Sequence, residues 1–208
     1  MSRKIKVIVV DDSAVVRNIL VSNLKKYDDI EILGAARDPY EARDMIVKFK
    51  PDVITLDIEM PKMSGLEFID ILMKNYPLPI VVVSSLVSGK CETSLKALEL
   101  GAVEILAKPQ MDLSNKLPLL IDELHEKIIA ASNARIYKIP KIENINKNTI
   151  NTTILSEIHT TDKIIAIGAS TGGTEAIARV LEKLPKNMPP IIITQHMPAG
   201  FTKSFADR

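Results

Sequence analysis

The sequence Lys-Val-Ile-Val-Val-Asp-Asp-Ser at residues 6–13 is a short β-branched run that ends abruptly in two acids. Apolar residues recur at helical spacing over 13–26, so the two stretches predict a strand, an acidic loop and a helix. The same alternation continues, with further strands expected at 31–36, 52–57, 79–84 and 103–107 and further helices at 38–49, 66–75, 93–100 and 116–130. The pattern predicts an α/β fold, a doubly wound, five-stranded parallel sheet with helices on both faces.

Composition excludes several classes of protein. The 208 residues carry a formal net charge of +1, which argues against a polyanion binder. The single cysteine, Cys91, cannot form an intrachain disulfide, so a disulfide-stapled secreted scaffold is excluded. No apolar run approaches the ~20 residues that span a bilayer. Asp11 and Asp12 end the first apolar stretch too soon for a signal peptide, so we expect a soluble, cytoplasmic protein without membrane insertion.

A change of composition after residue 130 divides the chain. Asparagines alternate with Lys, Ile and Thr over 131–162 without a helical or strand period, which is typical of a flexible linker. The alternation then restarts, with a strand expected at 163–167, a turn at 168–173, a helix at 174–184, a strand at 190–194 and a helix start at 201–208. We therefore expect a complete domain at 1–130, a linker at 131–162, and the incomplete start of a second parallel α/β domain at 163–208.

Polar side chains follow the strands of the first domain where those strands end. Asp11 and Asp12 end the first strand, Asp57 the third, Ser84 the fourth and Lys108 the fifth. Parallel strands share one carboxyl edge, and in the flavodoxin-like order 2-1-3-4-5 the first and third strands are neighbours. The three carboxylates are therefore expected to converge at this edge, where their mutual repulsion favours a bound cation.

The donor set indicates a particular chemistry. Oxygen-only, partly hydrated ligation suits Mg²⁺ better than a soft metal. A carboxylate beside Mg²⁺ can attack a phosphoryl group and form an acyl phosphate, while Lys108 and the Ser84 hydroxyl bind the phosphoryl oxygens. The alternative is that each acid is an ordinary loop residue after a strand, which explains any one position better than all of them together.

Four motifs carry a resemblance, namely Val-Asp11-Asp12-Ser, Thr-Leu-Asp57-Ile-Glu-Met-Pro, Val-Ser84-Ser and Ala-Lys108-Pro109. In this order, over about residues 3–125, they resemble the receiver domain of bacterial two-component response regulators. The resemblance implies that a histidine kinase phosphorylates Asp57. It also implies that Asp12, Asp57 and the Glu59 backbone carbonyl hold Mg²⁺, with Asp11 contributing through water.

The same resemblance implies a conformational switch that includes Ser84. The family also uses an aromatic residue three positions before the lysine, where this chain has Ile105. We therefore expect Ser84 to follow the phosphoryl group without an aromatic rotamer change.

The segment Gly-Ala-Ser-Thr-Gly-Gly at 168–173 follows an expected strand and opens an expected helix. It fits the pattern G-x-S-x-G, in which small neighbours allow a sharp turn that projects Ser170 at a helix N-terminus. His196 follows the next expected strand, so adjacent parallel strands would bring Ser170 and His196 to one edge. A phosphate-binding glycine loop is the alternative, but the P-loop lysine and G-x-G-x-x-G are absent.

Two longer motifs supply the context for this turn. Ile-Gly-Ala-Ser170-Thr-Gly-Gly-Thr and Gln-His196-Met-Pro-Ala-Gly-Phe-Thr resemble the start of the catalytic domain of the chemotaxis receptor methylesterases, the CheB family. The resemblance implies that a phosphorylated receiver activates hydrolysis of glutamate methyl esters, and deamidation of certain glutamines, on methyl-accepting chemoreceptors. Ser170 is then the nucleophile, His196 the general base and acid, and the Thr171 N–H an oxyanion donor.

The family's third catalytic residue, a late Asp, has no counterpart in this sequence. Only Asp207 follows His196, and it matches a helix of the family rather than the acid position. Because this acid is missing, we expect the chain to be C-terminally truncated. Loss of a triad acid can lower kcat by ~10⁴, so we also expect little or no esterase activity.

Two other functions are weighed against the sequence. The main alternative is a binding module, a receiver that accepts phosphoryl groups and carries a vestigial output segment. A DNA-binding regulator is disfavoured, because no basic recognition helix follows the linker. His125 and His159 have no partner pattern and are expected to be solvated.

Overall fold

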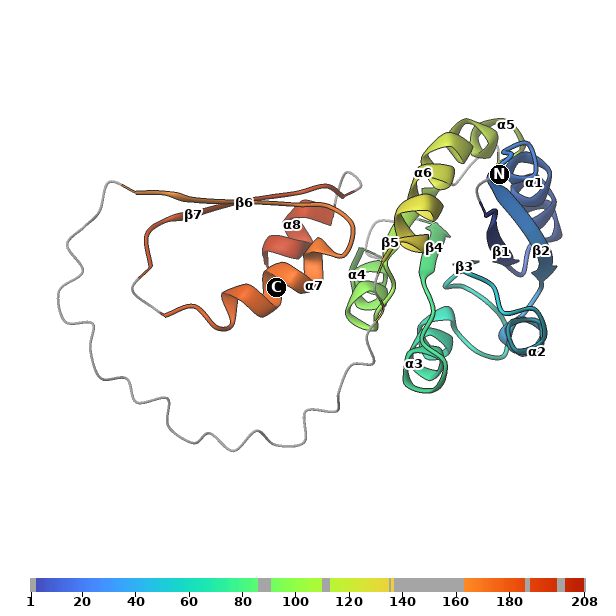
Figure 1. The fold of residues 1–208 in the computed structure, drawn as a ribbon, viewed down its shortest axis with the longest axis horizontal. Coiled ribbons are helices and arrows are strands. Elements are labelled where there is room, and N and C mark those ends of the chain that lie inside the picture. The colour runs from blue at the N-terminus through green and yellow to red at the C-terminus, as the bar shows by residue number, and fades with distance from the viewer. Residues whose placement is uncertain are drawn as a thin grey trace.

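The computed structural model describes residues 3–85, 91–109, 113–134, 136, 163–185, 188–197 and 201–207. Most of the expected linker at 131–162, including His159, lies outside these residues, as does the side chain of Cys91. Within the described part, the chain forms a five-stranded sheet and a separate two-stranded sheet (Figure 1).

The five-stranded sheet confirms the predicted architecture. All its pairs are parallel and its order is β2-β1-β3-β4-β5. The strands are β1 Ile5–Val10, β2 Ile30–Ala36, β3 Val53–Leu56, β4 Ile80–Ser85 and β5 Glu104–Lys108. Residues of β1, β3 and β4 are buried on both faces, as continuous β-branched runs in a parallel sheet require.

Helices cover both faces of this sheet because its side chains alternate between them. Ile8 and Val10 lie in a core cluster with residues of α2 (Pro39–Phe49), α3 (Gly65–Asn75) and α4 (Cys91–Glu99). Val7 and Val9 lie in a second cluster with residues of α1 (Ala14–Leu24) and α6 (Ile121–Ser132). The carboxyl edge of the sheet is thus held by two apolar layers.

Local sequence signals explain where most of these helices start. Asp38 caps α2, since its carboxylate accepts hydrogen bonds from the backbone N–H groups of Tyr40 and Glu41, and Pro39 occupies the first turn. Ser64 and Glu67 form a capping box at the start of α3 that the sequence analysis did not identify.

The helix expected at 116–130 is wrong at its start. Leu113–Lys116 forms a short helix (α5), Leu117–Leu120 a 3₁₀ turn (η1), and the α-helix begins only at Ile121. Pro118 accounts for the break, because it has no N–H to donate and its ring clashes with the preceding helical turn.

The second segment also follows the predicted alternation, with strands displaced by one or two residues. It contains β6 Ile165–Ala169, α7 Gly173–Leu181, β7 Ile191–Gln195 and α8 Phe201–Ala206, and β6 pairs with β7 in parallel. Helices α7 and α8 contact α4 of the first domain, and Phe201, 1% exposed, belongs to the α2–α4 core cluster (Figure 1). Packing therefore continues from the first domain into the second segment.

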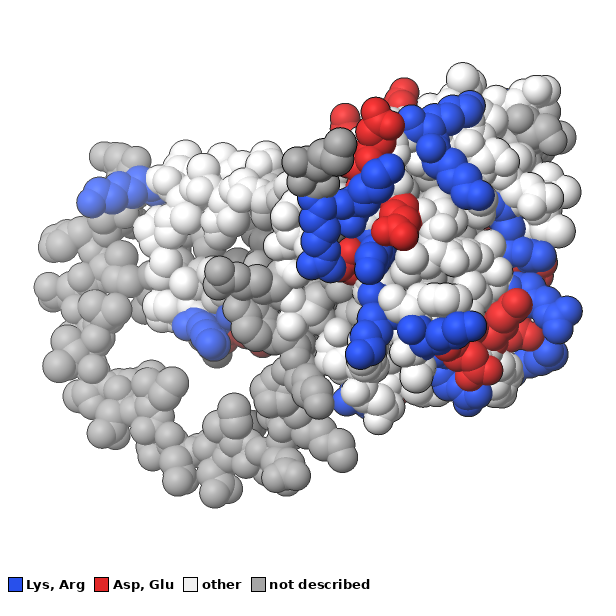
Figure 2. Space-filling model, turned by 45° about the vertical axis from the view of Figure 1, so that its right-hand side comes forward, with Lys and Arg blue, Asp and Glu red and all other residues white. Residues whose placement is uncertain are grey.

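No helix among the described residues is long and apolar enough to cross a membrane. On the face in Figure 2, Lys and Arg side chains are interspersed with Asp and Glu, in keeping with the net charge of +1.

Candidate functional site

The acidic pocket forms where β1 and β3 end side by side. Val10 pairs with Leu56, so Asp11 and Asp57 leave the sheet at the same level. The Asp57 N–H donates to the Val10 carbonyl over 2.9 Å, which fixes the second strand end against the first. The predicted convergence of these acids at one edge is confirmed.

Asp11, Asp12 and Asp57 each offer a carboxylate oxygen within 4.8 Å of the others. Asp11 and Asp57 are buried, whereas Asp12 is exposed. An all-carboxylate set with one side open to water matches the hard-oxygen, partly hydrated coordination that Mg²⁺ prefers. The residues present therefore fit a divalent cation.

Lys108 forms ion pairs with both buried acids. Its ammonium nitrogen lies 2.5 Å from Asp11 Oδ2 and 2.7 Å from Asp57 Oδ2, with the lysine side chain only 6% exposed. Burial raises the pKa of the Asp57 and Asp11 carboxyls, and the Lys108 ammonium opposes that rise in both. A positive group at this point thus keeps a buried carboxylate available as an anion.

Two features that sequence reasoning missed shape the loops of the pocket. The Arg17 guanidinium donates to the backbone carbonyls of Asp11 and Asp12, over 2.7 and 2.9 Å. A Cβ at Gly65 would lie 2.3 Å from the Asp57 carbonyl oxygen, so only glycine allows α3 to start this close to Asp57. An arginine one turn into the first helix, and a glycine after the Met-Pro loop, were the available signals.

An ion pair between Asp38 and Lys62 connects two further loops at this edge of the sheet. Lys62 Nζ lies 2.9 Å from Asp38 Oδ2 and so links the β3–α3 loop to the cap of α2. The backbone hydrogen bond from Glu41 and the side-chain bond from Lys62 hold the pKa of Asp38 below its ordinary value.

Ser84 and Ile105 lie on the neighbouring strands β4 and β5. Ser84 is buried beside Ala107 in the strand register, and it makes no hydrogen bond to Asp57 or Lys108 among the described residues. Ile105, which stands where the receiver resemblance has an aromatic residue, is buried.

The predicted serine and histidine leave the two-stranded sheet at equivalent positions. Ala169 pairs with Gln195, and Ser170 and His196 are the residues that follow them. The His196 N–H donates to the Ala169 carbonyl over 2.9 Å. Both residues are exposed and line one gap, but no direct hydrogen bond joins their side chains within the described part of the chain.

Helix α7 begins directly after the turn that carries Ser170, as the pattern G-x-S-x-G predicts. Gly172 adopts the left-handed conformation, with φ 71°, and the Gly173 N–H donates to the Ser170 carbonyl over 2.8 Å. The Thr171 N–H has no backbone acceptor in this part of the described chain, which leaves it open to a developing oxyanion.

The first domain forms one wall of the gap beside Ser170 and His196. Leu95 and Leu98 of α4 and Ile105 of β5 form this wall, and the volume of the gap is about 20 Å³, room for about one water molecule. The serine turn therefore faces the α4–β5 surface of the first domain.

Two other expectations concern polar side chains. Asp207 lines a hollow with Glu92 and Glu99 of α4, and it makes no hydrogen bond with His196 among the described residues. The expectation that His125 is solvated is wrong. Its ring stacks on Tyr27, with centroids 3.8 Å apart, and its Nε2 lies 2.9 Å from Asp29 Oδ1.

Comparison with known proteins supports the predicted family of each part of the chain. The family model "Response regulator receiver domain" matches residues 7–117, and the model "CheB methylesterase" matches residues 165–208. Among solved structures, the response regulator domain of Thermotoga maritima CheB is similar, with a TM-score of 0.60 and 39% identity. That match covers 64% of this chain and 99% of the other.

Curated relatives match almost the whole chain. Proteins named protein-glutamate methylesterase/protein-glutamine glutaminase are 49% identical over 99% of the chain in Nitrosomonas europaea and 51% identical over 99% in Syntrophus aciditrophicus. The chain spans 58% and 59% of the lengths of these two relatives. The chain therefore belongs to the response regulators, with a receiver domain followed by a segment of the CheB methylesterase family.

Proposed function

We propose that this protein is a chemotaxis methylesterase whose receiver controls the serine site. It hydrolyses glutamate methyl esters, and deamidates glutamines, on methyl-accepting chemoreceptors in the cytoplasm. The observation that carries the proposal is the placement of Ser170 and His196 after paired strand residues, against the α4–β5 surface of the receiver. The names of the curated relatives support the same activity.

The receiver step is a phosphoryl transfer to Asp57. The carboxylate attacks the phosphorus of a kinase phosphohistidine, the phosphorus–nitrogen bond breaks, and an acyl phosphate forms. Lys108, 2.7 Å from Asp57 Oδ2 before transfer, is placed to pair with a phosphoryl oxygen afterwards. Asp11, Asp12, Asp57 and the Glu59 carbonyl would hold Mg²⁺, which supplies positive charge to the phosphoryl oxygens when bound.

The esterase step uses the residues at the ends of β6 and β7. His196 takes the Ser170 hydroxyl proton while the serine oxygen attacks the ester carbonyl, and the Thr171 N–H donates to the oxyanion. Methanol leaves with the proton from His196, and water then releases glutamate from the acyl-enzyme. For a glutamine side chain the leaving group is ammonia.

Regulation of the esterase site follows from the α4–β5 surface of the receiver, which forms one wall of the gap beside Ser170. The gap between Ser170 and the α4–β5 surface holds only about 20 Å³, so a receptor side chain does not fit between these two surfaces while they face each other. Phosphorylation of Asp57 shifts the equilibrium toward an arrangement in which this surface no longer faces the serine. Ser84 and Lys108 lie on the paired strands β4 and β5, so they are placed to connect Asp57 with the α4–β5 surface that faces the serine site.

The activity itself is tested by methanol release from methylated chemoreceptors, comparing the chain with its Ser170→Ala variant in the presence of a phosphodonor. We expect only weak methanol release, dependent on Ser170, because the sequence supplies Ser170 and His196 but no Asp at the family's acid position. If phosphate is incorporated at Asp57 while methanol release is the same in both proteins, the chain is instead a phospho-accepting module with a vestigial output segment.

A further inference from the structure

The side chain of Gln195 connects the two residues of the proposed esterase site. Its Nε2 donates to the backbone carbonyl of Ser170 and to that of His196, each over 2.8 Å. Among the described residues, no other side chain hydrogen-bonds to both, and the serine hydroxyl and the imidazole do not bond directly. The amide therefore bridges the nucleophile turn and the histidine.

The orientation of this amide is fixed by its surroundings. Two carbonyl oxygens face Nε2, so the reversed amide would place its oxygen against two acceptors. In the observed orientation Oε1 is buried and has no hydrogen-bond partner among the described residues. An unpaired buried acceptor costs free energy, so the fold tolerates a penalty to keep the two donated bonds.

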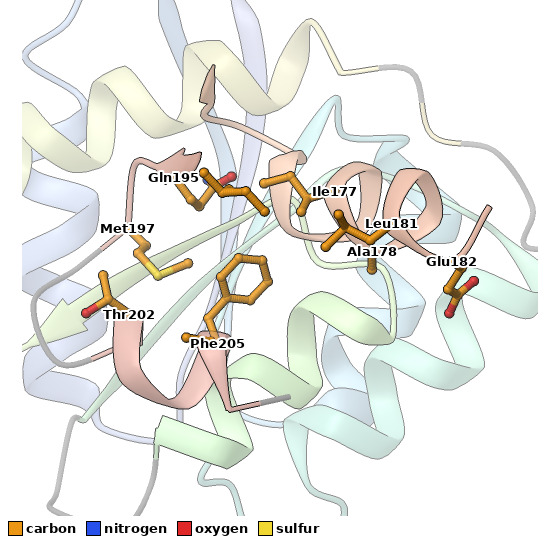
Figure 3. Close-up of a pocket in the computed structure, with 10 residues that line it drawn as sticks. Ile177, Ala178, Leu181, Glu182, Gln195, Met197, Thr202 and Phe205 are labelled. Atoms are coloured by element: carbon orange, nitrogen blue, oxygen red, sulfur yellow. The ribbon is translucent and has the colours of Figure 1, made fainter. Parts of the chain in front are cut away.

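The start of α7 makes room for the same side chain. A Cβ at Gly173 would lie 2.1 Å from Gln195 Oε1 and 2.6 Å from the Ala169 Cβ, which leaves space only for glycine. Gln195 also lines an apolar cavity of about 660 Å³ together with Ile177 and Met197 (Figure 3). The amide is thus enclosed between β7 and the first residue of α7.

We propose that Gln195 is a positioning residue that sets the separation and orientation of Ser170 and His196 for proton transfer. The inference rests on the proposed esterase function. Gln195 does not touch the ester, and it acts through the backbone of the two residues that do. Without its two bonds, the serine turn and the histidine are joined only by the strand pairing and the bond from the His196 N–H to the Ala169 carbonyl, and proton transfer from serine to imidazole becomes slower.

The test uses the full chain and a fluorophosphonate as a probe of Ser170. The serine oxygen attacks phosphorus, the phosphorus–fluorine bond breaks, fluoride leaves, and the serine proton passes to His196. The labelling rate is measured from pH 5 to 9 for the wild type, Gln195→Ala, Gln195→Glu, Ser170→Ala and a control, Thr194→Ala. Thr194 precedes Gln195 on β7 and is exposed.

We expect wild-type and Thr194→Ala proteins to label at the same rate, with an inflection that reports His196. Gln195→Ala should label at least tenfold more slowly and lose the inflection. Gln195→Glu should do the same, because a carboxylate is nearly isosteric but cannot donate to carbonyls. Melting curves for all variants separate loss of folding from loss of positioning, since a purely structural role would lower the melting temperature without removing the inflection.

The labelling rates distinguish failure of the positioning role from failure of the proposed nucleophile. If the wild type labels with an inflection and Gln195→Ala behaves identically, the positioning role is overturned while the proposed nucleophile stands. If the wild type labels no faster than Ser170→Ala, the proposed nucleophile fails and the positioning role fails with it. Amide-exchange NMR gives an independent reading, because slow exchange of the Gln195 side-chain protons supports the bridge and fast exchange contradicts it.

Discussion

At the scale of single residues, Lys108 is the group on which the acidic pocket depends. It lies within 2.7 Å of two buried carboxylates, so its removal leaves like charges facing each other. Lys108→Met should lower the free energy of unfolding by about 3–5 kcal/mol and abolish phosphorylation by a small phosphodonor. Urea unfolding and phosphate incorporation measure the two effects.

An exposed ion pair supplies the matched control for that substitution. Lys74 lies 2.5 Å from Asp70, but its side chain is 63% exposed, so Lys74→Met should change stability by at most about 1 kcal/mol. Equal losses in the two variants would contradict the importance of burial at Lys108.

Asp38 provides a prediction on pH at the same scale. Its folded pKa lies below the ordinary value of 3.8, so it contributes stability above that value and loses the contribution as pH falls through the folded pKa. Asp38→Ala should therefore destabilise the protein at pH 7, and the difference from wild type should shrink below about pH 4. Urea unfolding at several pH values measures this, and a difference that grows on acidification would contradict the assignment.

The sequence predicted the residues of the pocket because strand ends obey a simple topological rule. Asp11, Asp57 and Lys108 meet once the strand order is known. It did not predict Arg17 or Gln195, because both act through backbone carbonyls that carry no residue-specific signal. Contacts of that kind depend on loop geometry, which residue types alone do not determine.

At the scale of elements, the capping box of α3 deserves a direct test, since this helix follows the loop beyond Asp57. The Ser64 side chain accepts from the Glu67 N–H, and the Glu67 carboxylate accepts from the Ser64 N–H. Ser64→Ala should reduce the free energy of unfolding by about 1 kcal/mol. Ser22→Ala, at an exposed position inside α1, is the control, and an equal loss in both variants would show that the cap contributes nothing beyond an ordinary helix serine.

Element types were predictable and their ends less so. The interruption at Pro118 was visible as a residue, but its effect on a helix expected at 116–130 depended on whether the preceding turn was helical. The observed bounds of β6 and β7 differ from the expected ones by one or two residues, because register and turn geometry decide which residues of a short apolar run are paired.

At the scale of the whole molecule, the contact between α8 and the receiver was beyond sequence reasoning. Phe201 is 1% exposed because it packs with receiver residues far away in the sequence. Phe201→Ala should weaken this contact and raise the rate of fluorophosphonate labelling at Ser170 without phosphorylation. Lys203→Ala, on the same helix but exposed, is the control, and faster labelling in both or neither would count against a closed arrangement held by Phe201.

The central claim is that phosphorylation of Asp57 opens the serine site. The most direct measurement is the rate of methanol release from methylated chemoreceptors, with and without phosphodonor, in the wild type and in Asp57→Asn. We expect the phosphodonor to accelerate methanol release by the wild type and to leave Asp57→Asn unchanged. Equal acceleration of both proteins, or no acceleration of a wild type shown to be phosphorylated, would contradict it.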